Sequence, residues 1–238
     1  MKIEGSQTYL ITGGGGAIAG SIARVFHEAG ARLVLVDRDR ESIERRAAEL
    51  GAVPLQADLT RYESVAAMVE DAMSASGTID GVIHTTGGFA MAPAVESGPE
   101  LYDRMLDLNL RSLVYTARAL LPHFVDNGSG FLAAFSAAPA WDGAGGGSMS
   151  LYAAAKAAVA AYLKAVDDEL GTSGIATAVV YPMGVVDTAA NRRSMPDEDP
   201  SQWIDPDEIA RALLFAATRG SRGRVQEIPI TAAPPAAE

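Results

Sequence analysis

Short apolar runs alternate with longer segments of helical periodicity along most of the 238-residue chain. The runs are continuously apolar, which is typical of strands in a parallel sheet that is covered on both faces. We predict strands at residues 8–12, 32–37, 52–56, 81–85, 130–136 and 175–181, and a weaker one at 225–230. Helices are predicted between them, at residues 17–29, 40–50, 62–75, 102–125, 152–170 and 206–218.

This repeated alternation of strand and helix predicts an α/β fold with a doubly wound sheet of about seven parallel strands. No linker or internal repeat divides the chain, so we expect residues 1–238 to form a single domain. The Pro/Ala-rich tail at 232–238 is expected to be loose.

Charge and composition narrow the possible functions. Nineteen basic residues against 30 acidic ones give a net charge of −11, which argues against nucleic-acid and membrane-surface partners because such a chain repels phosphates and anionic lipid. No apolar run approaches the roughly 20 residues that span a bilayer, and charge and glycine interrupt the N-terminal segment where a signal peptide would need an apolar stretch. The absence of cysteine excludes disulfides and thiolate metal sites, and no metal is expected. We therefore expect a cytoplasmic protein.

A glycine-rich turn, TGGGGAIAG, follows the first predicted strand and opens the first predicted helix. Backbone N–H groups in such a turn, together with the helix N-terminus, favour a phosphate. Asp37 ends the second strand, where a carboxylate accepts hydrogen bonds from ribose hydroxyls and repels a 2′-phosphate. These features predict a dinucleotide site that favours NAD(H) over NADP(H), although the neighbouring Arg38 is able to hold a 2′-phosphate.

Tyr152 and Lys156 stand four residues apart in an alanine-rich segment of a chain that has only three lysines. Side chains at this spacing meet on one face of a helix. A nearby ammonium stabilises phenolate, so we expect it to lower the pKa of the phenol and allow proton exchange at neutral pH. Taken alone, the pair is equally compatible with an ordinary tyrosine and a solvated lysine.

The glycine-rich turn near the N-terminus, followed later in the chain by the Tyr-x-x-x-Lys pair, resembles the motif pattern of the short-chain dehydrogenase/reductase family. The resemblance covers nearly the whole chain. The resemblance implies a Rossmann-type NAD(P)-binding domain and an oxidoreductase. The turn begins with Thr12 and Gly13 as in the family, but Ala17 and Ala19 replace two of its later glycines. These substitutions bear on cofactor affinity more than on cofactor identity.

The resemblance also implies roles for individual residues. Tyr152 would exchange a proton with the substrate oxygen, Lys156 would bind the nicotinamide ribose, and Asn109 would hold a water relay behind the lysine. Asp58 corresponds to a residue that contacts the adenine. The implied cofactor-binding positions are Gly13, Gly16, Ala17, Ile18, Asp37, Arg38, Asp58, Leu59, Thr86, Gly87, Tyr152, Lys156, Pro182 and Thr188. His84 replaces a family asparagine, and a structural histidine at a strand end is the favoured interpretation.

The family serine that binds the substrate oxygen is missing at its usual place. Ala137 occupies that position, and Ser136 precedes it. Three alternatives stay open: Ser136 is re-aimed by the loop that follows, Ser148 or Ser150 takes the role, or Tyr152 acts without a serine.

Residues 184–203 form the predicted substrate loop and resemble dihydropteridine reductase and its bacterial relatives. The matching residues are Asp187, Thr188, Asn191, Arg192, Met195, Pro196, Asp199, Ser201 and Trp203. Apolar residues on predicted pocket loops indicate an apolar or planar substrate, although packing roles explain several of them equally well. These residues are Phe89, Met91, Trp141, Met149, Met183, Met195 and Trp203.

We therefore predict an NAD(H)-dependent short-chain oxidoreductase that interconverts a carbonyl or quinonoid substrate and its reduced form. The alternatives are a quinonoid dihydropteridine reductase, a non-catalytic dinucleotide sensor and a structural subunit. A homodimer or homotetramer packed through the helices at 102–125 and 152–170 is expected, because the small-residue surface of the second helix is apolar all round.

Overall fold

The computed structural model describes residue 3 and residues 7–143, 146–220 and 222–233. In this part of the chain, seven parallel strands form one sheet in the order β3-β2-β1-β4-β5-β6-β7. The strands are β1 (Thr8–Thr12), β2 (Arg32–Asp37), β3 (Val53–Gln56), β4 (Gly81–His84), β5 (Gly130–Phe135), β6 (Ile175–Pro182) and β7 (Glu227–Ile230). The predicted doubly wound fold is confirmed, including the weak last strand. Residues 234–238 of the predicted loose tail lie outside the described residues.

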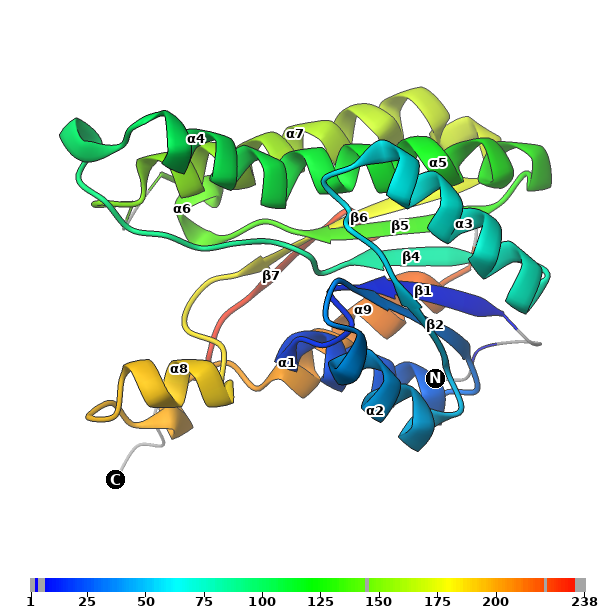
Figure 1. Cartoon of the computed structure of the whole chain (residues 1–238), viewed down its shortest axis with the longest axis horizontal. Helices are drawn as coiled ribbons and strands as arrows, with labels where there is room; N and C mark the ends of the chain where they lie inside the picture. Colours follow the sequence, from blue (N-terminus) through cyan, green and yellow to red (C-terminus); the bar gives the residue numbers. More distant parts are fainter. Residues whose placement is uncertain (1–2, 4–6, 144–145, 221, 234–238) are drawn as a thin grey trace.

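Helices cover both faces of the sheet (Figure 1). One layer contains α1 (Ala17–Glu28), α2 (Arg40–Leu50) and α9 (Pro206–Thr218), and the other contains α3 (Tyr62–Ser76), α4 (Pro99–Leu106), α5 (Ser112–Asn127) and α7 (Ser150–Leu170). A separate hydrophobic core fills the space on each face. Strands β1 and β4 are buried along their whole length, which explains their continuously apolar sequences.

The strand order reverses between β1 and β4. The chain proceeds from β1 to β2 and β3 on one side, then returns to place β4 on the other side of β1. Doubly wound sheets bind ligands in the crevice outside the carboxyl ends of their strands, at this reversal. The fold therefore locates the candidate site before any side chain is considered.

The predicted helix at 102–125 is longer and less regular than expected. It comprises α4, a π-helical turn (Asp107–Arg111) and α5. Two short α-helices were not predicted, α6 (Ala138–Trp141) and α8 (Ala189–Ser194), because one or two turns are too short for helical periodicity to show. None of the helices in the described residues combines the length and the hydropathy that a membrane crossing requires.

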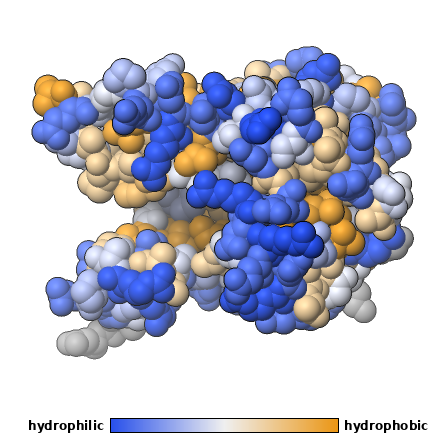
Figure 2. All heavy atoms as spheres, in the orientation of Figure 1, coloured by the Kyte–Doolittle hydropathy of each residue, from blue (hydrophilic) through white to orange (hydrophobic). Residues whose placement is uncertain are grey.

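The segment that carries α8 leaves the sheet after β6 and returns before α9. Its two ends meet in an isolated parallel bridge between Val186 and Ile204, and the N–H of Asp187 donates to Ile204 O at 2.8 Å. Figure 1 shows α8 standing away from both helical layers. Figure 2 shows the surface hollowed between this segment and the opposite layer, with apolar residues on the floor of the hollow.

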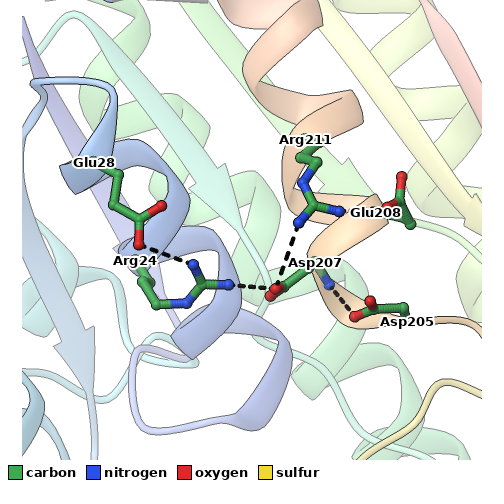
Figure 3. A network of polar contacts seen from close by, with 6 residues as sticks. All are labelled: Arg24, Glu28, Asp205, Asp207, Glu208 and Arg211. Carbon is green, nitrogen blue, oxygen red and sulfur yellow. Dashed lines mark hydrogen bonds and ion pairs between the residues drawn. The ribbon is translucent and has the colours of Figure 1, made fainter.

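Ion pairs hold α1 against α9 in the helical layer that contains α1, α2 and α9 (Figure 3). Arg24 of α1 pairs with Glu28 at 2.9 Å and also with Asp207 of α9. Asp205 caps α9 by accepting a hydrogen bond from the N–H of Asp207 at 2.8 Å. Because α1 carries the glycine-rich turn at its N-terminus, this contact helps to fix the direction in which that N-terminus points.

Candidate active site

The glycine-rich turn between β1 and α1 uses its own N–H groups to hold its shape. The N–H of Gly14 donates to the end of β2 at 2.9 Å, and the N–H of Gly16 donates to Gly13 O at 2.8 Å. The next N–H groups belong to Ala17 and Ile18 in the first turn of α1, where a helix provides no internal acceptor. These groups, at the positive end of the helix dipole, are suited to bind a phosphate.

Close packing explains why the turn consists of glycine. A Cβ atom on Gly14 would lie 3.2 Å from Cβ of Leu35, and one on Gly15 would lie 2.1 Å from Oγ of Ser42. The glycines therefore let the turn approach β2 and α2, and do not simply make it flexible. Ala19 is buried in the core, so its methyl group is accommodated there.

Asp37 lies beside this turn, at the end of β2. Its Oδ2 accepts a hydrogen bond from the N–H of Gly15 at 3.0 Å, and its Oδ1 accepts one from the N–H of Asp39 at 3.1 Å. The neighbouring Arg38 is exposed. The carboxylate is thus oriented by the same turn that presents the phosphate-binding N–H groups.

Asp58 and Leu59 follow β3 on the same edge of the sheet. Asp58 is exposed, whereas Leu59 is buried. Hydrogen bonds from the hydroxyl and the N–H of Thr60 lower the pKa of Asp58. Asp58 is therefore an ionised side chain that a ligand can reach.

Tyr152 and Lys156 lie on the first turns of α7, above the end of β5. The Lys156 ammonium is 5.9 Å from the centroid of the Tyr152 ring. It donates a hydrogen bond to Phe135 O at 2.9 Å, and the residue is buried. The structure thus brings the predicted pair together and anchors its ammonium to the sheet.

The direction of the tyrosine pKa differs from the expectation. Burial raises the pKa of Tyr152 to about 12 and lowers the pKa of Lys156 to about 8. Desolvation therefore outweighs the attraction between phenolate and ammonium that the spacing suggested. Tyr152 therefore keeps its proton at neutral pH in this structure. It is in the protonated form that a proton donor needs, but it is a weaker acid than a free phenol.

Asn109 lies in the π-helical turn and is fully buried. Its Nδ2 donates to Met105 O at 2.9 Å and to Gly88 O at 3.0 Å, and its Oδ1 accepts from the N–H of Gly88 at 3.2 Å. A Cβ atom on Gly87 would lie 2.7 Å from Oδ1 of Asn109 and 3.1 Å from Nζ of Lys156. The π-helical turn therefore joins the loop after β4 to Lys156, and such turns are frequent at functional sites.

Ser136 and Lys156 form a reciprocal pair of contacts between β5 and α7. The Ser136 hydroxyl donates to the backbone oxygen of Lys156 at 2.9 Å, while the Lys156 ammonium donates to the backbone oxygen of Phe135. Ser136 is buried. Its single hydroxyl hydrogen is used within the protein, so the contact favours a role in positioning the lysine.

The other candidates for the missing serine lie elsewhere. Ala137 follows Ser136 and is buried. Ser148 is exposed and has a φ of 57°, and its backbone oxygen accepts from the N–H of Ala92 at 2.8 Å. Ser150 is exposed at the first turn of α7.

His84 is buried beneath the site, with hydrogen-bond partners at both ring nitrogens. Its Nδ1 lies 3.0 Å from Oγ1 of Thr12, and its Nε2 lies 3.0 Å from Oγ of Ser112. Burial, with a further contribution from the charge of Lys156, lowers the pKa of His84 to about 3. A neutral histidine that links β1, β4 and α5 agrees with the structural interpretation.

Three further predicted positions line the same end of the sheet. The N–H of Thr86 lies 3.4 Å from Oγ1 of Thr12. Pro182 ends β6. Thr188 caps α8 by accepting a hydrogen bond from the N–H of Asn191 at 3.1 Å.

Two exposed aromatic side chains project near these groups. The Phe89 ring packs edge-on against Tyr152, with 4.9 Å between the centroids, and is 54% exposed. Trp141 packs in the same way against Tyr181 and is 43% exposed. The sequence placed Phe89 on a pocket loop but did not reveal its contact with Tyr152. No cluster of metal-binding side chains occurs among the residues that the structure describes.

Comparisons with known proteins agree with this geometry. The sequence profile of the short chain dehydrogenase family matches residues 7–199. An uncharacterized oxidoreductase of Staphylococcus aureus (strain MW2) is 30% identical over 233 residues, which cover 97% of this chain and 99% of the relative. An uncharacterized oxidoreductase of Staphylococcus haemolyticus is 27% identical, with 93% and 95% covered. The chain belongs to the short-chain dehydrogenase/reductase family of oxidoreductases.

Solved structures show the same architecture. The 3-ketoacyl-(acyl-carrier-protein) reductase from Brucella melitensis, complexed with NADH, is 27% identical and superimposes with a TM-score of 0.84, covering 94% of this chain and 96% of that one. An alcohol dehydrogenase from the archaeon Thermococcus sibiricus, complexed with 5-hydroxy-NADP, is 23% identical with a TM-score of 0.86, covering 98% and 100%. The second similarity concerns the fold alone.

Proposed function

We propose that the protein is an NAD(H)-dependent oxidoreductase that interconverts a carbonyl or quinonoid substrate and its reduced form, with Tyr152 as the acid/base. The observation that carries the proposal is the convergence of Tyr152, Lys156 and Asn109 at the carboxyl ends of the strands. The turn and the carboxylate of Asp37 lie at the same edge of the sheet. The fold alone would not indicate catalysis, because function depends on the site.

The residues present fit a nicotinamide dinucleotide. The N–H groups of Ala17 and Ile18 would bind its pyrophosphate, and Asp37 would accept hydrogen bonds from the adenosine ribose. Asp58 would lie at the adenine and Lys156 at the nicotinamide ribose. A bound nicotinamide dinucleotide supplies the hydride for reduction of the substrate, or accepts it for oxidation. The proposal favours NAD(H), because Asp37 would face a 2′-phosphate with like charge.

Tyr152 would handle the proton. In the direction of reduction its hydroxyl hydrogen passes to the substrate oxygen, and in the direction of oxidation the phenolate takes the proton back. The protonated state favoured by the raised pKa is the state that reduction requires. Lys156, whose pKa of about 8 leaves it largely charged at neutral pH, would stabilise the phenolate that remains. Asn109 would keep the loop after β4 against this lysine.

A quinonoid substrate, as in dihydropteridine reduction, is favoured within this proposal by one contact. The Ser136 hydroxyl donates to the backbone of α7, and Ala137 occupies the usual serine position. A ketone would therefore receive less polarisation than in the family pattern, whereas a quinonoid compound needs less. The exposed rings of Phe89 and Trp141 offer apolar surfaces to a planar molecule.

The test is to incubate the purified protein with NADH or NADPH and a panel of carbonyls, quinones and quinonoid pterins. Consumption of the reduced cofactor should depend on the substrate, be faster with NADH, and disappear in Tyr152→Phe. Binding of NADH without turnover on any compound would favour a dinucleotide sensor. Failure to bind either cofactor would overturn the proposal.

A further inference from the structure

One peptide group in the glycine-rich turn is held at both ends by side chains of opposite charge. The carbonyl oxygen of Gly14 accepts a hydrogen bond from the guanidinium of Arg46. The N–H of the same peptide group, which belongs to Gly15, donates to the Asp37 carboxylate at 3.0 Å. The peptide dipole thus has the Arg46 cation at its negative, oxygen end and the Asp37 carboxylate at its positive, N–H end. Both charges are therefore stabilised by the dipole.

Arg46 comes from α2 and reaches under the turn. Its Nη1 also donates to the carbonyl oxygen of Gly16 at 2.9 Å, so one guanidinium spans the two carbonyls on either side of Gly15. The side chain is partly buried, and burial lowers the pKa of Arg46, although a guanidinium stays charged in proteins. A Cβ atom on Gly20 would lie 2.8 Å from its Nη2, so the bare backbone of α1 makes room for it.

We propose that Arg46 is a positioning residue for the dinucleotide, acting through the turn that presents the N–H groups of Ala17 and Ile18. The inference rests on the proposed function. By fixing the carbonyls of Gly14 and Gly16, Arg46 prevents the Gly14–Gly15 peptide from rotating. It also places a positive charge behind the turn.

Arg46 and Asp37 should therefore depend on each other. Rotation of the shared peptide would remove the hydrogen bond that orients the carboxylate, and loss of the carboxylate would free the N–H end of the peptide. Residues joined in one hydrogen-bond network give non-additive effects when both are changed. Two independent contributors to binding would instead multiply their effects.

The neighbouring Arg45 provides a matched control. It lies on the same helix, has 69% of its side chain exposed and pairs with Glu41 at 3.4 Å, away from the turn. Arg46→Met and Arg45→Met remove the same charge from neighbouring positions of α2, of which only Arg46 reaches the turn; Arg45 is also the more exposed of the two. The dissociation constant for NADH, measured by fluorescence titration, should rise about ten-fold in Arg46→Met, a loss typical of a charge-assisted hydrogen bond. It should stay near the wild-type value in Arg45→Met, and Arg46→Lys should recover part of the affinity.

Gly20→Ala tests the same point without removing the guanidinium. The added methyl group would displace Arg46, while alanine is the better helix former, so the fold should tolerate the change. A several-fold weaker affinity for NADH, with undiminished resistance to urea, is expected. This variant also separates positioning from a general loss of stability if Arg46→Met folds poorly.

The double variant Arg46→Met, Asp37→Ala completes the experiment. Its affinity for NADH should be no weaker than that of the weaker single variant. Equal affinities for NADH in wild type, Arg46→Met and Gly20→Ala would overturn the role of Arg46 and leave the proposed function intact. The same conclusion would follow if the affinity losses of the two single variants multiplied in the double variant. A wild-type protein that binds no NADH would overturn the proposed function, and the assignment of Arg46 with it.

Discussion

The buried His84 should make the protein lose stability at mildly acidic pH. The Ser112 hydroxyl donates to Leu108 O at 2.8 Å, so Nε2 of His84 must be the donor in its contact with Ser112. Nδ1 is then the acceptor for the Thr12 hydroxyl. A second ring proton, on Nδ1, would face the Thr12 hydroxyl, which already donates its hydrogen to this nitrogen. The resulting positive charge would also be buried in the core near the charge of Lys156.

The magnitude follows from the two pKa values. The His84 pKa falls from 6.5 to about 3 on folding, so the neutral form is retained in the folded protein. As the pH falls through 6.5, the unfolded chain binds a proton that the folded chain refuses, and the stability contributed by His84 decreases. At pH 5 the difference is about 1.5 pH units, or about 2 kcal/mol at 1.36 kcal/mol per unit.

The assay compares urea unfolding of the wild type and of His84→Asn and His84→Gln, at one protein concentration, from pH 7.5 to 5. The variants lack the titrating ring, so they should be less stable at pH 7.5 but less sensitive to acid. The gap between wild type and variant should therefore shrink by about 2 kcal/mol over this range. Parallel curves would refute the reasoning, because they would mean that His84 binds its proton equally well in both states.

Other changes test the site directly. Asp37→Ala should narrow the preference for NADH, mainly by improving the affinity for NADPH; an unchanged ratio of the two dissociation constants would contradict the role of the carboxylate. Ser136→Ala should cost about 1 kcal/mol of stability and only a modest part of the turnover, through a less well positioned Lys156. Loss of a hydroxyl that bonds the substrate would instead cost about 10²-fold in rate. Ala137→Ser should speed the reduction of simple ketones, and no gain would show that this position does not face the substrate. Light scattering at micromolar concentration should give a dimer or tetramer, and a monomer would rule out the assembly predicted through the helical residues 102–125 and 152–170.

Local signals predicted the sheet well because each strand is marked by its own residues. The runs at 8–12 and 32–37 coincide with β1 and β2, because β1 is buried throughout and the four apolar residues at 33–36 of β2 are all buried. Strand β3 differs, because it lies at the edge of the sheet and its residues alternate between exposed and partly buried. An apolar run therefore marks such a strand less clearly in the sequence. The spacing of Tyr152 and Lys156 was equally local, because one helix carries both.

Contacts between distant elements could not be predicted in the same way. The hydrogen bond from Ser136 to α7 depends on how β5 packs against that helix. The sequence around Ser136 and Ala137 could not indicate which way the serine hydroxyl points. The π-helical turn at Asn109 spans only five residues, which is too short for a period of its own to show in the sequence. The raised pKa of Tyr152 depends on burial by several elements, whereas the sequence suggested only the nearby ammonium.

The bridge between Val186 and Ile204 makes the segment with α8 a self-contained insert. Because its ends are hydrogen-bonded to each other, the distance between β6 and α9 does not depend on what lies between them. Doubling the length of a closed loop costs only about 0.6 kcal/mol. One wall of the hollow in Figure 2 should therefore tolerate a change of length or sequence with little effect on the sheet. A graft from a relative that keeps Thr188, an implied cofactor-binding position, is expected to change substrate choice through this segment and leave the dinucleotide site as it is.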